Sequence, residues 1–419
     1  MTRQSVQGRR AVPRRQAFLL APAVLGVSAG LLMAASVLAN TVPAAASTGT
    51  SVSGTLQAWG DDLRGQLGNG ATGLVDQPVT VQLPAGVTIT AVAAGGQATL
   101  AVTSTGRVYA WGNNHYGQLG DGTTNDSHTP VLVRLPKGTV ATGVAAGDGD
   151  SLAVTSTGRV YAWGNNHYGE LGDGSTVNRI LPVRVALPHG TKAVSVTASY
   201  NYSMALTSTG SVLAWGYNGS GQLGNGFLTA SEVPARVKLP AKVKVKMLVS
   251  GGYDGLALTE SGHVMAWGDD GFGQLGNGNA KTSLRPVPVK LPKGVKIIAV
   301  AGGSQHSLAL TSSGEVLAWG RDTWGQLGNA TTARSRVLPV RVRIPRGDRV
   351  VAISAGGGFS LAVTSTGQVL AWGHNAWGQL GNGTLKDSHV PVVVKLPATM
   401  TAVGLARGPT TRHALSIVH

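Results

Sequence analysis

Short apolar stretches separated by turns recur along the chain from about residue 51 onward. Each repeat holds four of them, represented by AVAAG at 91–95, SLAVT at 151–155, RVYAWG at 159–164 and PVPVKLP at 286–292. They are rich in Val and Ala, and Ser-Thr-Gly or a longer Gly/Asn loop separates them. This pattern is typical of β-strands joined by tight turns. No long helical periodicity interrupts it.

The four-strand unit repeats with a fixed period. Its Ala-Trp-Gly centres are spaced by 52 residues five times and then by 53. The centres are Trp59, Trp111, Trp163, Trp215, Trp267, Trp319 and Trp372. The second and third units share LAVTSTGRVYAWGNNHYG without a change, which indicates a recent duplication. A period near 50 residues with β composition predicts an all-β fold, a seven-bladed β-propeller of four-stranded antiparallel blades.

Residue chemistry orders the strands of a blade, from strand A at the axis to strand D at the rim. The first strand is rich in small residues, as in AVAGG at 299–303. The last strand carries Lys or Arg and has proline at both ends. Charges and prolines keep exposed edge strands from pairing with another chain. The propeller is predicted over 55–419. It begins at a C strand and ends with A-like and B-like stretches, so pairing of the N- and C-terminal strands in one composite blade should close it.

Residues 1–46 differ from the repeats. Five arginines and no acid lie in or before an apolar run from Ala17 to Leu38, and small residues follow it. This is the layout of an export signal peptide, with cleavage expected after Ala46 or after Ala39 and a short linker at 47–54. The alternative is that the run, long for a signal peptide, stays as an N-terminal membrane anchor. We expect an extracellular or cell-envelope location, with membrane contact only through this segment if it is uncleaved.

The repeat unit matches a known family. The fullest copy, AGGSQHSLALTSSGEVLAWGRDTWGQLGN at 301–329, resembles the repeat of the regulator of chromosome condensation family. The resemblance covers about 51–419 in seven in-phase copies and implies a seven-bladed propeller. Members include nucleotide-exchange factors for a nuclear GTPase, chromatin binders, a plant UV-B photoreceptor and secreted bacterial β-lactamase inhibitors. None of them makes or breaks covalent bonds of a bound substrate.

Departures from these relatives limit what the resemblance implies. The export signal makes the chain look like a secreted bacterial member, and it disfavours guanine-nucleotide exchange and chromatin binding. The photoreceptor's Gly-Trp-Arg-His-Thr motif is absent, and the inhibitor relatives have shorter repeats without the Gly-Gln-Leu-Gly element. No relative's site can therefore be carried over residue by residue.

Composition and motifs argue against catalysis. The chain has no cysteine, which excludes disulfides, thiolate metal sites and cysteine nucleophiles. No His-Glu-x-x-His, Gly-x-Ser-x-Gly elbow or phosphate loop occurs in the right context. Asp148-Gly149-Asp150 is interpreted as an ordinary turn rather than a calcium loop. We predict a non-enzymatic protein with no catalytic residue, no metal site and no cofactor.

Antiparallel order places the A–B and C–D loops on one face, where aromatic residues gather. The predicted set is Tyr116, Tyr168, Phe272, Trp324 and Trp377 in the C–D loops, and Tyr200, Tyr202, Tyr253 and Phe359 in the A–B loops. These residues either pack on their own loops or form a surface suited to a protein or glycan. The second reading predicts a secreted, monomeric binding propeller, with inhibition as one form of that role and an unidentified protein or envelope polymer as partner. The seven repeat tryptophans are interpreted as packing between blades.

The opposite face is predicted to be basic. Net charge is +16 for the chain, and +11 once residues 1–46 are set aside. The D–A segments on this face carry Lys137, Lys192, Lys242, Lys244, Lys246, Lys293, Lys296, Arg346 and Arg349. They are either simply solvated or they retain the protein on anionic envelope polymers or lipid headgroups. No nucleic-acid partner is expected.

Overall fold

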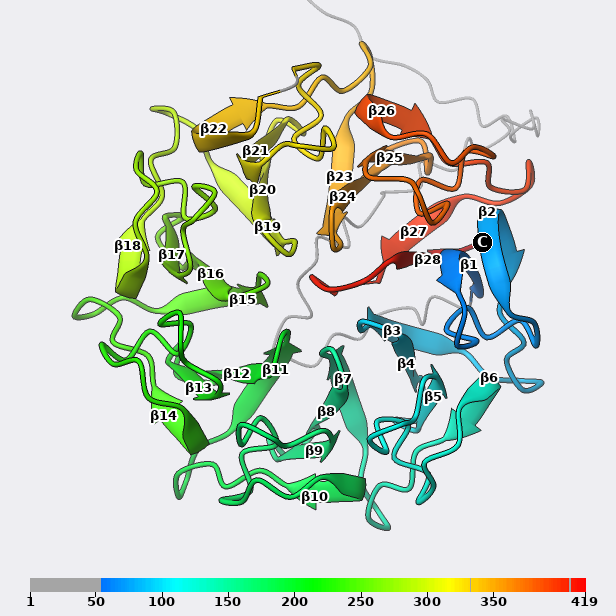
Figure 1. Cartoon of the computed structure of the whole chain (residues 1–419), viewed down its shortest axis with the longest axis vertical. Helices are drawn as coiled ribbons and strands as arrows, with labels where there is room; N and C mark the ends of the chain where they lie inside the picture. Colours follow the sequence, from blue (N-terminus) through cyan, green and yellow to red (C-terminus); the bar gives the residue numbers. More distant parts are fainter. Residues whose placement is uncertain (1–53, 332, 407) are drawn as a thin grey trace, which may run out of the picture. The chain divides into compact units, whose positions relative to one another are not determined.

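The computed structural model describes residues 54–331, 333–406 and 408–419. In this part of the chain, 28 strands form seven four-stranded antiparallel sheets, and no helix occurs. The sheets stand as blades around a central axis, with one strand of each blade near the axis and one at the rim (Figure 1). The predicted seven-bladed propeller is confirmed. The predicted signal peptide and nearly all of the predicted linker lie outside the described residues.

The strands occupy equivalent places in the seven blades. The A strands, nearest the axis, are β3 (Ile89–Ala94), β7 (Ala141–Ala146), β11 (Ala193–Ala198), β15 (Val245–Ser250), β19 (Ile297–Gly302), β23 (Val350–Ala355) and β27 (Ala402–Leu405). The B strands are β4 (Ala98–Thr103), β8 (Asp150–Thr155), β12 (Tyr202–Thr207), β16 (Asp254–Thr259), β20 (His306–Thr311), β24 (Phe359–Thr364) and β28 (His413–Val418).

The outer two strands of each blade follow the same scheme. The C strands are β1 (Thr55–Asp62), β5 (Val108–Gly112), β9 (Val160–Gly164), β13 (Val212–Gly216), β17 (Val264–Gly268), β21 (Val316–Arg321) and β25 (Val369–Gly373). The D strands, at the rim, are β2 (Gly73–Thr80), β6 (Ser127–Leu132), β10 (Arg179–Arg184), β14 (Ser231–Arg236), β18 (Ser283–Pro288), β22 (Ser335–Arg341) and β26 (Ser388–Val393).

The two ends of the propeller share one blade, as predicted. Its strand order is β2-β1-β28-β27, so the first two strands pair with the last two (Figure 1). The register runs from Thr55 opposite Val418 to Gly60 opposite His413. We call this sheet the closing blade, because its backbone hydrogen bonds join the first and last strands of the propeller and close the ring of blades.

Each repeat tryptophan joins its blade to the preceding one. All seven side chains are fully buried. Trp215 shows the arrangement, since its indole Nε1–H donates to the carbonyl oxygen of Glu170 at 2.8 Å. The hydroxyl of Ser203 donates to that same carbonyl at 3.0 Å. The equivalent indole bond is present at the other six blade junctions. A large apolar side chain thus fills each wedge while its one polar atom is satisfied.

Small side chains of the A strands surround the axis. A cavity of about 60 Å³ remains, lined mainly by small residues of the A strands and by Gly408 and Pro409. The latter two belong to the A–B loop of the closing blade, which spans 406–412, whereas the other six A–B loops have three residues each. The long loop reaches across the end of the axis, where Ser304 Oγ donates to the Pro409 carbonyl at 2.9 Å and Gly357 N donates to the Thr411 carbonyl at 2.9 Å.

Candidate functional site

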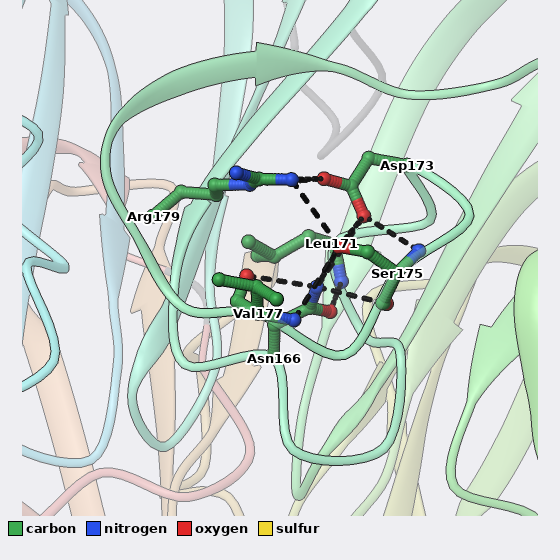
Figure 2. Close-up of polar contacts among 6 residues, drawn as sticks. All are labelled: Asn166, Leu171, Asp173, Ser175, Val177 and Arg179. Carbon is green, nitrogen blue, oxygen red and sulfur yellow. Dashed lines mark hydrogen bonds and ion pairs between the residues drawn. The ribbon is translucent and has the colours of Figure 1, made fainter.

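The C–D loops are held in shape by one side chain each. Three residues after each repeat tryptophan, an Asp or Asn oxygen accepts the backbone N–H five residues further on. Figure 2 shows the loop after β9, where Asn166 Oδ1 accepts Leu171 N at 2.9 Å and Asn166 Nδ2 donates to the carbonyls of Ser175 and Val177 at 2.9 and 3.1 Å. The same Oδ1 contact recurs at Asp62, Asn114, Asn218, Asp270, Asp322 and Asn375. These loops are therefore rigid platforms for the residues at their tips.

A second contact fixes the backbone of the aromatic residues. The Gln of the Gly-Gln-Leu-Gly element accepts the backbone N–H of the aromatic residue two positions earlier. Gln118 Oε1 accepts Tyr116 N at 2.9 Å, and Gln379 Oε1 accepts Trp377 N at 2.8 Å. The Gly-Gln-Leu-Gly element is evident in the sequence, but no role was predicted for its glutamine. Its recurrence two residues after a predicted surface aromatic was the available signal.

We call the face that carries the A–B and C–D loops the loop face. Four tyrosines from three blades form a continuous cluster on it, which we call the tyrosine cluster. The aromatic rings of Tyr168 and Tyr217 lie 4.9 Å apart, and those of Tyr217 and Tyr253 lie 6.0 Å apart. Tyr200 stacks on Tyr253 at 5.1 Å, and its hydroxyl is 3.2 Å from Ser304 Oγ. Burial, together with the neighbouring tyrosines, raises the pKa of Tyr253. Three of these four residues belong to the predicted set.

A second group on the same face combines arginines with aromatic rings. The guanidinium of Arg321 lies 4.1 Å from the centre of the Trp324 ring and 5.1 Å from that of Phe272. Arg334 lies 5.5 Å from the Phe272 ring. His374 also packs against Trp324, with ring centres 4.8 Å apart. Burial and the charge of Arg334 lower the pKa of Arg321.

The long loop of the closing blade adds a third arginine to this group. Arg412 lies over the ring of Trp377 at 5.0 Å, and both side chains remain at least partly exposed. Burial lowers the pKa of His374, the charge of Asp387 opposes this, and the charges of Arg412 and Arg321 lower the pKa further. We call this group the arginine–tryptophan cluster. It comprises Phe272, Arg321, Trp324, Arg334, His374, Trp377 and Arg412.

The residues that sequence reasoning missed share a repeat position. Tyr217, Arg321 and His374 each lie two residues after a repeat tryptophan, where the other four units have Asp61, Asn113, Asn165 and Asp269. Variation at a fixed position beside an otherwise constant motif was the signal that could have found them. Arg334 lies in the loop with the one extra residue, and Arg412 lies in the extended A–B loop. Both interruptions of the period therefore bring an arginine to this cluster.

Two predicted surface residues are misplaced by the sequence reasoning. Tyr202 and Phe359 are the first residues of β12 and β24, and they are 0% and 1% exposed. The preceding A–B loops are only three residues long, so these side chains already lie in the strand ladder opposite Gly216 and Gly373. The Tyr202 hydroxyl is used internally, since it donates to the carbonyl oxygen of Gly251 at 3.3 Å. Neither residue is available to a partner.

The other predicted aromatics reach the surface to different degrees. Tyr116 is 39% exposed and Tyr168 is 37% exposed. Phe272, Trp324, Trp377, Tyr200 and Tyr253 are partly exposed. The loop face thus combines loops fixed by hydrogen bonds, partly exposed aromatic rings and arginines, which are features typical of protein-recognition surfaces.

Comparison with known proteins places the chain. Residues 54–410 match the model of the RCC1-like domain. The chain belongs to the RCC1-like domain family. It is similar to the ultraviolet-B receptor UVR8 of Arabidopsis thaliana, with 34% identity over 341 residues that cover 81% of this chain and 77% of the receptor.

Solved structures of other RCC1-like propellers superpose on this one. Human WBSCR16 aligns with a TM-score of 0.78 and 25% identity, covering 87% of this chain and 98% of that one. Yeast RCC1 (Prp20), crystallised bound to Kap60, aligns with a TM-score of 0.77 and 26% identity, covering 88% of this chain and 89% of that one.

The face opposite the loop face is basic. Each of the cations predicted there is exposed. All nine belong to the B–C and D–A side of this RCC1-like domain: Lys137, Lys192, Lys242, Lys244, Lys246, Lys293, Lys296, Arg346 and Arg349. The turns of this face also hold three acids, Glu260, Glu315 and Asp348. A field of one sign therefore dominates it.

The described part of the chain holds neither a metal-binding cluster nor a membrane-spanning helix. In residues 54–331, 333–406 and 408–419, no group of three or more His, Asp or Glu side chains is placed to hold a metal ion. Over the same residues there is no helix of the length and hydropathy that a membrane span requires.

Proposed function

We propose that this RCC1-like domain is a non-enzymatic binding protein that holds a partner protein on its loop face. The arginine–tryptophan cluster carries the proposal. Its tryptophans and arginines are the residue types enriched at binding hot spots, and they stand partly exposed on loops fixed by internal hydrogen bonds. Yeast RCC1 (Prp20), a relative with the same fold, has been crystallised bound to the protein Kap60.

The proposed place of action is outside the cytoplasm. Support comes from the arginine-rich start and apolar run of residues 1–46. N-terminal sequencing of the protein recovered from the medium or envelope of a bacterial host tests this. A chain that begins at Ser47 or Asn40 would support export with cleavage, and an intact chain confined to the cytoplasm would refute it.

Replacing both partly exposed tryptophans of the cluster should abolish capture of the partner. Truncating a hot-spot residue costs about 2 kcal/mol or more, so Trp324→Ala with Trp377→Ala should raise Kd by at least about 30-fold. The measurement is quantitative capture from envelope and secreted fractions. The control is Phe227→Ala, which removes an aromatic ring that is 58% exposed and lies outside the cluster. Equal recovery of the same proteins by the double variant and the control would sink the proposal.

A second candidate function is retention on an anionic surface. The observation that favours it is the basic face, with nine exposed cations against three acids. Binding to vesicles that contain phosphatidylglycerol should weaken steeply between about 50 and about 500 mM salt, because screening acts strongly on exposed charges.

Changing Lys242, Lys244 and Lys246 to Gln should weaken that vesicle binding, while the Trp324/Trp377 double variant should retain it. Phosphatidylcholine vesicles serve as the uncharged control. Binding that is equally strong at both salt concentrations would exclude the basic face as its cause.

A further inference from the structure

A pocket of about 580 Å³ lies between the aromatic residues of two adjacent blades. Its walls are Tyr116, Asn165, His167, Tyr168, Thr176, Val177 and Asn178. The volume is in the range of small-molecule sites. The lining contains no Lys, Arg, Asp or Glu, although charged residues occur elsewhere on the same face. An occupant would therefore meet aromatic rings, amides, a hydroxyl and an imidazole.

The two tyrosine rings are held in place by their surroundings. Tyr116 lies against Gly149, where a Cβ would come within 3.1 Å of its Cδ2 atom, so the absent side chain allows this close approach. Tyr168 is flanked by Tyr217 at 4.9 Å and by His167 at 4.7 Å between ring centres. Both rings keep more than a third of their surface exposed. They are rigid, accessible platforms, which lowers the entropy lost when a ligand stacks on them.

Polar groups at the rim of the pocket are free to form hydrogen bonds with a ligand. Within the described residues, the hydroxyl of Thr176, the imidazole of His167 and the Nδ2 amide of Asn178 form no hydrogen bond. Asn178 uses only its Oδ1, which accepts Asn166 N at 2.8 Å. The loop that carries Thr176 and Asn178 is the one fixed by Asn166 (Figure 2). A loop fixed by hydrogen bonds thus places unpaired donors and acceptors around the two rings.

We propose that this pocket binds a neutral carbohydrate, a short stretch of an uncharged glycan. Aromatic rings pack against the apolar C–H faces of a sugar, while amides, hydroxyls and imidazoles pair with its hydroxyl groups. A charged ligand would lack a countercharge in the lining, and a purely apolar ligand would leave the rim groups unpaired. The site is distinct from the arginine–tryptophan cluster, so it goes beyond the proposed protein-binding role.

The chain contains a charged counterpart of this pocket one blade earlier. The loop sequence NNHYG is identical at 113–117 and 165–169. At the earlier junction, however, Arg64 stands where Tyr116 stands in the pocket, and Asp126 stands where Asn178 stands. The Arg64 Nη1 and Asp126 Oδ2 atoms form an ion pair at 3.4 Å. The same loop is therefore stable with either a charged pair or a neutral pair at these two positions.

The test exchanges these pairs. The wild type and Tyr116→Arg/Asn178→Asp are titrated calorimetrically with four neutral probes, cellohexaose, chitohexaose, maltohexaose and laminarihexaose. At least one probe should bind the wild type, and the double variant should bind it at least about tenfold more weakly. Its Tm should stay close to that of the wild type, because the neighbouring junction already carries this pair.

A gain-of-binding variant gives an independent readout. Arg64→Tyr/Gln97→Gly/Asp126→Asn should create a second neutral pocket and raise the stoichiometry from one site to two, with Gln97 changed because it stands where Gly149 stands beside Tyr116. The proposal is overturned if no probe binds the wild type up to about 10 mM, or if Tyr116→Arg/Asn178→Asp binds as tightly as the wild type. Neither result changes the expected outcome of the capture experiment with Trp324 and Trp377. The glycan-binding proposal and the protein-binding proposal can therefore be refuted independently.

Discussion

Deleting residues 401–419 is expected to lower Tm by about 10 °C or more, or to cause aggregation. The deletion removes β27 and β28, the inner half of the closing blade, and bares the edge of β1 that β28 covers from Thr55 to Gly60. It also exposes the cores of the flanking blades. The buried apolar side chains that are lost include Leu405, Leu415, Ile417 and Val418.

The size of the effect follows from burial. Each fully buried side chain of this kind is worth about 1.5–3 kcal/mol, so four of them rival the net stability of about 5–15 kcal/mol of a typical domain. A linear repeat array would respond differently, because losing one terminal repeat leaves the other contacts intact. Calorimetry of the truncated chain distinguishes the two architectures. A Tm within about 3 °C of the intact protein would show that ring closure contributes little.

The second large effect concerns Asp254, a carboxylate with no partner. Its side chain is 1% exposed, and both of its carboxyl oxygens lack a hydrogen bond within the described residues. Burial, and then the charges of Asp269 and Asp270, raise the pKa of Asp254 well above 3.8. The folded state therefore holds a proton that the unfolded state releases above this pH. Stability from this group is complete at low pH and is lost as pH rises through the folded-state pKa.

Asp254→Asn removes that pH dependence. The stability of the variant relative to the wild type should grow from pH 4 to pH 7 by at least about 1.4 kcal/mol, the value of one pKa unit. The new amide can also change the free energy of unfolding by an amount that does not depend on pH, and such a change leaves this trend unaltered. Denaturant unfolding at a series of pH values measures it, with Asp348→Asn on the surface as a control for loss of one charge. A difference between variant and wild type that is flat from pH 4 to pH 7 would contradict the assigned environment.

The comparison must be made between variants, because two histidines act in the opposite direction. Burial lowers the pKa of His306 and of His413 from 6.5 to about 3. Both stay neutral in the folded state, so the stability they contribute is present above pH 6.5 and is lost as pH falls toward 3. The pH profile of the whole protein sums these opposing contributions.

Periodicity and edge chemistry were enough to predict the fold. The regular spacing of the repeat tryptophans set the number of blades. Proline and lysine around strands such as β18 marked the rim, and the C strand at one end with A and B strands at the other predicted the closing blade. These features act within one strand or one blade. They can therefore be predicted from local sequence without knowledge of how neighbouring blades are angled.

The surface clusters depend on geometry that the sequence does not display. Arg412 reaches Trp377 from an A–B loop that is longer than the other six, and the path of that loop cannot be read from the sequence. Tyr168 and Tyr217 approach across a blade junction whose angle is set by the packing of Trp215. The prediction for Tyr202 was wrong for a local reason. An error of one or two residues in the start of β12 assigned a buried strand residue to the preceding loop.

Site-specific photo-crosslinking tests the central claim, that the loop face is the partner-binding surface. A photoreactive amino acid is placed at Thr323, an exposed residue beside Trp324, and in a second protein at Lys293 on the basic face. After irradiation in envelope and secreted fractions, the account predicts a discrete crosslinked protein from Thr323, and its loss when Trp324 and Trp377 are changed to Ala. A discrete adduct from Lys293 and none from Thr323 would contradict it.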